Sequence, residues 1–143
     1  MPAERERVTV LDSTGLDWLS RLEAVRVSHS APDPHRPPPP IVPTVVLAET
    51  YVGPKDHHLA QGLKRAEIYD LDRTLATEAA RLRHLTGPTK KGRAPSAVDA
   101  VVMAVADRLA LHAEVLIITA DLHDLDALRS HALHHDHIGI DRL

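Results

Sequence analysis

The chain has 143 residues, enough for one domain with a sizeable core, and its formal net charge at pH 7 is −3. It contains no cysteine, which excludes a disulfide framework, thiolate metal sites and a cysteine nucleophile, and its net charge gives no overall attraction for nucleic acid. The first residues lack the apolar segment of a signal peptide, and no apolar run reaches the roughly 20 residues that cross a bilayer. We therefore expect a cytoplasmic protein that does not enter the membrane.

The first elements form a strand followed by a helix. Residues 8–11 (VTVL) predict a short apolar strand that ends at Asp12, and residues 13–27 repeat leucines at helical spacing. Residues 28–40 (SHSAPDPHRPPPP) are too rich in proline for a helix or a central strand, so they predict an extended surface connection. Because little chain precedes this connection, we expect residues 1–143 to form a single domain.

A second strand and helix follow the proline-rich connection. Residues 41–42 predict a short strand, and Pro43 suits the first turn of a helix. This helix carries Glu49 among valines, which indicates that the carboxylate lies on a buried face. A buried carboxylate is costly without a metal or hydrogen bonds, although a solvated helix face would explain Glu49 equally well.

The middle of the chain continues the alternation of strands and helices. Residues 57–65 predict a short helix, residues 68–69 a strand, and residues 73–85 an amphipathic helix. The loop at 87–95 (GPTKKGRAP) is basic.

The longest clear pattern lies at residues 96–128. Ser96 with Asp99 predicts a capped helix start, and the aliphatic run 115–119 predicts a strand that is buried on both faces. Asp121 follows that strand, and residues 137–140 predict a last strand. The predicted class is α/β, with three layers (α/β/α) and a central parallel sheet of four to five strands.

Four acidic residues differ from the ordinary surface charges: Asp12 and Asp121 follow strands, Asp99 opens a helix and Glu49 lies in an apolar segment. Open parallel sheets bind ligands at the carboxyl ends of their strands, and Mg²⁺ or Mn²⁺ prefers carboxylate oxygens. The pattern therefore predicts a divalent metal site. The alternative is that the three aspartates are helix caps, since acids favour helix N-termini.

Four segments in order, VTVLDSTGLDWL, IVPTVVLAETY, APSAVDAVVMAVADRL and VLIITADLHDLDAL, resemble the motif blocks of the PIN-domain family, especially its VapC-like ribonuclease toxins. The resemblance covers nearly the whole chain. It implies an endoribonuclease that uses Mg²⁺ or Mn²⁺ to cleave RNA, with a cognate antitoxin protein as partner and a homodimer as a candidate assembly. Carried over by motif, the metal-binding acids are Asp12, Glu49, Asp99 and Asp121. By the same resemblance Asp124 either assists a second metal or caps the following helix, and Ser13 and Thr119 supply small hydroxyls beside the acids.

The basic loop supplies the best candidates for contacts with RNA phosphates. These residues are Lys90, Lys91 and Arg93, for which a solvated surface loop is the alternative.

Three other functions compete with the nuclease. The segment DLDRTL resembles the motif of haloacid-dehalogenase-type phosphatases, with Asp70 as nucleophile and Asp72 as acid/base, but it lies far from the start of the chain and follows only a short strand. We therefore interpret Asp72 as a helix cap. The histidines near the end of the chain fit no zinc motif, which favours an exposed polar terminus; they are His131, His134, His135 and His137. A catalytically silent PIN-like binding module also remains open.

Overall fold

The computed structural model describes residues 4–26, 38–50, 57–89 and 92–143. These residues contain a five-stranded sheet in which every neighbouring pair is parallel and the strand order is β3-β2-β1-β4-β5. The strands are β1 (Glu6–Leu11), β2 (Ile41–Pro43), β3 (Glu67–Tyr69), β4 (Ala113–Thr119) and β5 (Ile138–Arg142). The predicted α/β class and parallel sheet are confirmed.

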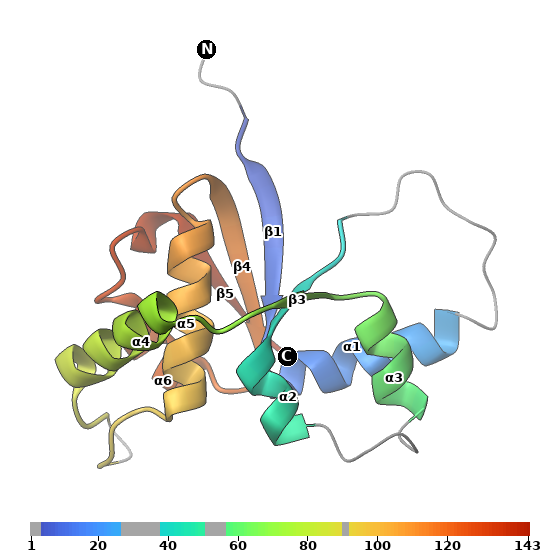
Figure 1. Cartoon of the computed structure of the whole chain (residues 1–143), viewed down its shortest axis with the longest axis horizontal. Helices are drawn as coiled ribbons and strands as arrows, with labels where there is room; N and C mark the ends of the chain where they lie inside the picture. The colour runs from blue at the N-terminus through green and yellow to red at the C-terminus, as the bar shows by residue number, and fades with distance from the viewer. Residues whose placement is uncertain (1–3, 27–37, 51–56, 90–91) are drawn as a thin grey trace.

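Helices cover the sheet from two sides. In Figure 1, α4, α5 and α6 lie to one side of the sheet, α1 and α3 lie to the other, and α2 continues from the carboxyl end of β2 between them. The arrangement is a three-layer α/β/α fold. The helices are α1 (Ser13–Arg26), α2 (Thr44–Thr50), α3 (His57–Lys64), α4 (Arg73–Thr86), α5 (Ala97–Leu109) and α6 (Leu122–Arg129), and a 3₁₀ turn spans His135–His137.

Among the described residues, α5 buries more side chains than any other helix. Its residues from Ala100 to Asp107 are all buried, because this helix packs on β1, β2 and β4 and is covered by α4 and α6. The Ser96 hydroxyl accepts a hydrogen bond from the Asp99 amide at 3.0 Å, which confirms the predicted N-cap. The buried charged residue of α5 is Asp107, whose carboxylate accepts hydrogen bonds from the amides of Leu133 and His134.

Three sequence expectations were wrong in detail. Pro43 is the last residue of β2, paired with Tyr69, and α2 begins one residue later; proline is tolerated at a strand end because fewer ladder donors are needed there. Glu49 is exposed, because the short helix α2 buries only Val46 among its residues. Strand β4 is not buried on both faces: Leu116 is 38% exposed, although its neighbours Val115 and Ile117 are buried.

No described helix combines the length and the apolar character that crossing a membrane requires.

Most of the proline-rich connection predicted at 28–40 lies outside the described residues. Within the described part, the Pro40 carbonyl accepts a hydrogen bond from the Glu67 amide at 2.8 Å, just before β2 pairs with β3.

Candidate metal centre

The strand order reverses between β1 and β4. The chain leaves β1 toward β2 and β3 on one side, whereas β4 is followed by β5 on the other side. In open parallel sheets a crevice forms at the carboxyl ends of such a pair, because the following connections leave in opposite directions. Asp12 follows β1 directly and Asp121 lies two residues after β4, so both residues lie at this edge of the sheet.

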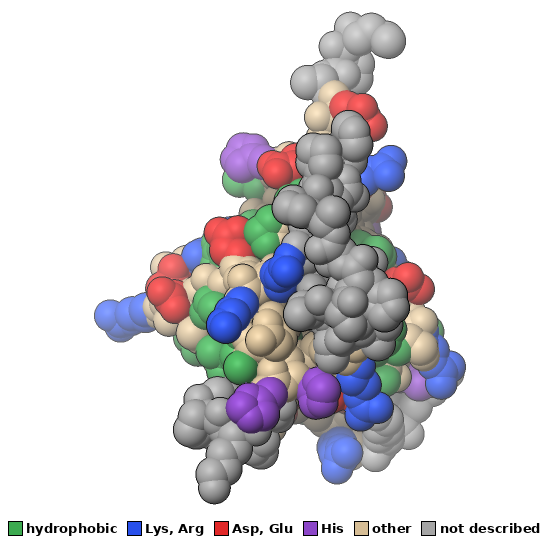
Figure 2. Space-filling view, turned by 90° about the vertical axis from the view of Figure 1, so that its right-hand side faces the viewer, with side chains coloured by type: hydrophobic (Ala, Val, Ile, Leu, Met, Phe, Trp, Pro, Cys, Tyr) green, Lys and Arg blue, Asp and Glu red, His purple; other side chains and the backbone are tan. Residues whose placement is uncertain are grey.

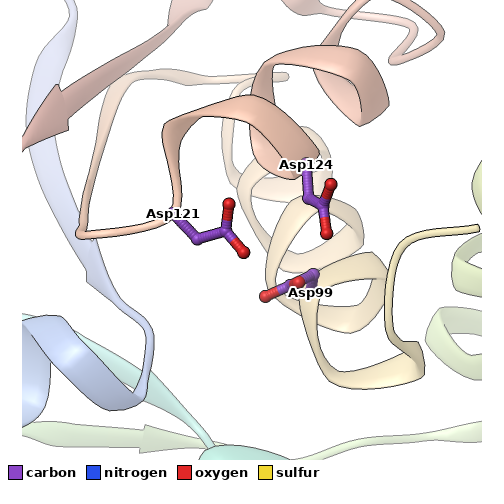
Figure 3. A group of neighbouring side chains, drawn as sticks. All are labelled: Asp99, Asp121 and Asp124. Carbon is purple, nitrogen blue, oxygen red and sulfur yellow. The ribbon is translucent and has the colours of Figure 1, made fainter. Parts of the chain in front are cut away.

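Three aspartates form a group of the size of a metal site. One carboxylate oxygen each from Asp99, Asp121 and Asp124 lies within 4.8 Å of the others, and the three side chains point toward one another (Figure 3). Asp99 comes from the first turn of α5, Asp121 is the N-cap residue of α6, and Asp124 lies in the first turn of α6. The Asp121 side chain makes no capping hydrogen bond to α6, so helix capping does not account for its position.

The electrostatics of the group favour a cation. Burial raises the pKa of the Asp99 carboxyl from 3.8 to about 6, and the negative charges of Asp121, Asp12 and Asp124 act in the same direction, against a hydrogen bond with Ser96. The raised pKa means that the ionised form of Asp99 is disfavoured in this group unless a positive charge binds beside it. A divalent ion held by hard oxygen ligands supplies that charge, so this set of residues could hold a metal ion.

Asp12 lies beside the group but is engaged differently. It is 4% exposed, and its Oδ1 accepts hydrogen bonds from the Thr14 hydroxyl and the Gly15 amide, both at 2.8 Å. Its Oδ2 accepts a hydrogen bond from the Thr119 hydroxyl. Asp12 is close enough to raise the pKa of Asp99, although it is not one of the three residues of the group.

The two hydroxyls expected beside the acids were only partly identified from the sequence. Thr119 does lie at Asp12, but the second hydroxyl is that of Thr14, not of Ser13. The signal in the sequence was the run Ser13–Thr14 after Asp12, which does not reveal which hydroxyl turns back to the carboxylate.

The basic loop contacts the site through a threonine. The Thr89 hydroxyl lies 3.3 Å from Asp124 Oδ1, and the Thr89 amide donates to the Arg93 carbonyl at 2.9 Å, which closes a turn. Arg93 is exposed, whereas Lys90 and Lys91 lie outside the described residues. Glu49, on the exposed surface of α2, does not belong to the group of three.

The competing phosphatase motif has a structural role. Asp72 caps α4 by accepting from the Leu75 amide at 2.8 Å, and both of its oxygens accept from the Arg108 guanidinium at 2.9 and 3.1 Å. The hydrogen bonds from Arg108 lower the pKa of Asp72 from 3.8 to about 2. The predicted cap is confirmed, and the cap together with the ion pair accounts for the position of the Asp72 side chain.

The histidines near the end of the chain make local contacts. His134 Nδ1 lies 3.1 Å from Asp107, His137 Nδ1 lies 2.5 Å from Glu114, and His135 Nδ1 lies 3.1 Å from the Ala132 carbonyl. None of them belongs to the metal-sized group found in the described part of the chain.

Comparisons of the chain with protein-family models, with curated proteins and with solved structures found no match.

Proposed function

We propose that this chain is a metal-dependent endoribonuclease of the PIN type, which binds Mg²⁺ or Mn²⁺ through Asp99, Asp121 and Asp124 and hydrolyses RNA phosphodiester bonds. The observation that carries the proposal is the convergence of these three carboxylates within 4.8 Å at the point where the strand order reverses. The order of the four sequence motifs supports the choice of family.

The donor set suits these ions. Mg²⁺ and Mn²⁺ take oxygen ligands and Mg²⁺ keeps several waters, so a few carboxylates at one edge of the sheet are enough. When bound, such a metal supplies an activated water for attack on a phosphate. Asp99, Asp121 and Asp124 would provide the anionic ligands, and because the pKa of Asp99 is raised to about 6, metal binding would favour the deprotonated form of this carboxyl.

The basic side chains near this edge of the sheet are suited to a polyanionic substrate. Helix α3 carries three exposed residues that are basic or can become so: His57, His58 and Lys64. Figure 2 shows histidine, lysine and arginine side chains along the lower rim of this face. The lower rim is the end of the molecule toward which β1 and β4 point in Figure 1. Basic side chains position nucleic acid through its phosphates. We assign Lys90, Lys91 and Arg93 to the same task. A cognate antitoxin, a homodimer and a cytoplasmic location follow from the proposed family.

The test is cleavage of a fluorescently labelled single-stranded RNA by the purified chain, with Mn²⁺ or with EDTA. We expect cleavage that needs the metal and is lost in Asp99→Asn and Asp121→Asn. Asp126→Asn is the matched control, because Asp126 lies on the same helix as Asp124 but pairs with Arg129. Cleavage that persists in EDTA, or that survives both substitutions, would contradict the proposal.

A second candidate is a PIN-like binding module without catalytic activity. It is favoured by the three hydrogen bonds that Asp12 accepts, since a carboxylate held in this way performs a structural task without metal. This alternative predicts that the chain binds no Mn²⁺ at the three aspartates and leaves RNA intact, while Asp12→Asn still destabilises the fold.

A further inference from the structure

Thr14 connects two segments that are far apart in the sequence. Its hydroxyl donates to Asp12 Oδ1 at 2.8 Å and accepts from the Ala120 amide at 2.8 Å, across 106 positions. The side chain of Thr14 therefore joins the start of α1 to the segment that leaves β4. A hydroxyl on an exposed residue can bond to water instead, so the use of both its donor and its acceptor inside the protein is a specific arrangement.

Thr119 makes a second, similar bridge. Its hydroxyl donates to Asp12 Oδ2 and accepts from the Asp121 amide at 2.8 Å. The two oxygens of one buried carboxylate thus hold, through two hydroxyls, the consecutive backbone amides of Ala120 and Asp121. These two amides belong to the segment between β4 and α6, which contains Asp121 of the proposed metal site.

This restraint matters because the three carboxylates of the proposed site repel one another. One carboxylate oxygen each of Asp99, Asp121 and Asp124 lies within 4.8 Å of the others, and ionised carboxylates at such distances repel one another when no cation lies between them. Repulsion would move Asp121 outward, since it lies on a connection between β4 and α6 and not inside a regular element. Bonds to the backbone of Ala120 and Asp121 oppose that movement.

We infer that Thr14 is a positioning residue, which holds the segment 119–121 so that the Asp121 carboxylate stays within reach of a metal shared with Asp99 and Asp124. The inference rests on the proposed metal site. It assigns a role to a residue that supplies no ligand itself, and it predicts that the hydroxyl, not the shape of the side chain, is what matters.

The experiment compares Thr14→Val, which keeps the shape, with Thr14→Ser, which keeps the hydroxyl. Thr77→Val is the control, because the Thr77 hydroxyl donates to the Arg73 carbonyl on the exposed face of α4. Outer-shell partners of metal sites typically change affinity by about 10–100-fold, so we expect Thr14→Val to weaken Mn²⁺ binding by roughly 10-fold or more in calorimetric titration. Thr14→Ser and Thr77→Val should bind like the wild type.

A second measurement needs no metal. Hydrogen exchange of the Ala120 amide should be faster in Thr14→Val than in the wild type and in Thr14→Ser, because the amide loses its acceptor. Unchanged Mn²⁺ affinity in Thr14→Val would overturn the positioning role while the metal site stands. A wild-type chain that binds no Mn²⁺ would instead overturn the proposed function, and with it the role of Thr14.

Discussion

The Thr119 hydroxyl, at the end of β4, donates a hydrogen bond to the Asp12 carboxylate, which follows the neighbouring strand β1. Both residues are buried, so the bond joins the two strands where the strand order reverses. Thr119→Val leaves a buried carboxylate oxygen without its donor and should lower the free energy of unfolding by about 1–3 kcal/mol. Urea denaturation measures this. Thr119→Ser should recover most of the loss, and equal stability of Thr119→Val and the wild type would contradict the role of the bond.

The close approach of α1 to β4 depends on Gly15. A Cβ at this position would clash with the Ile118 carbonyl and would lie 3.2 Å from Leu11 Cδ2. Gly15→Ala should therefore destabilise the fold by about 1–3 kcal/mol, because backbone on both sides resists the shift. The control is Gly139→Ala, whose Cβ would lie 3.5 Å from Leu116 Cδ1, an ordinary contact. Thermal unfolding of the two variants should separate them, and similar melting temperatures would show that α1 can move away from β4.

The ion pair between Asp72 and Arg108 gives a stability effect with a defined pH range. Because the pKa of Asp72 is lowered from 3.8 to about 2, the ionised carboxylate stabilises the folded state above pH 4, and this contribution is lost as the pH falls toward 2. We expect the wild type to be more stable than Asp72→Asn at pH 6, and the difference to shrink between pH 4 and pH 2. A constant difference over that range would exclude the ion pair as its cause. RNA cleavage should be unchanged in this variant.

Much of the fold follows from the sequence because its signals are local. Aliphatic runs that are followed closely by an aspartate mark the strands β1 and β4, and the Ser96 cap marks the start of α5. The exposure of Glu49 could not be deduced, because α2 has seven residues and periodicity in so short a helix does not fix which face is buried.

The contacts of the site that depend on the pairing of neighbouring strands could not be predicted from the sequence either. Thr14 finds its partner at Ala120 only because β4 pairs with β1, and a one-dimensional pattern does not contain that pairing. Asp107 was missed for the same reason: its partners, the amides of Leu133 and His134, lie 26 and 27 positions away. An aspartate within the otherwise apolar run of α5 was the signal that could have found it.

Asp99→Asn tests the charge balance of the site. The pKa of Asp99 is raised from 3.8 to about 6, so its carboxyl ionises less readily in the folded state than in the unfolded state. The free energy of unfolding therefore falls as the pH rises from about 4 to 6. Asparagine removes the charge and keeps the backbone amide that Ser96 caps. At pH 7 without metal the variant should melt higher, by about 2–4 °C for each 1 kcal/mol of relieved repulsion. Mn²⁺ should stabilise the wild type but barely affect the variant. A lower melting temperature with an unchanged Mn²⁺ response would identify Asp99 as a purely structural residue.

The most direct test of the proposed metal centre is the location of Mn²⁺ by paramagnetic broadening of amide signals in a heteronuclear NMR spectrum. The expected result is selective loss of the signals of residues 97–100 and 120–124, because these segments carry Asp99, Asp121 and Asp124. The same titration of Asp121→Asn should need far more Mn²⁺. Broadening centred on the histidines of 131–137, or equal broadening over the whole surface, would contradict a metal centre at the carboxyl ends of β1 and β4.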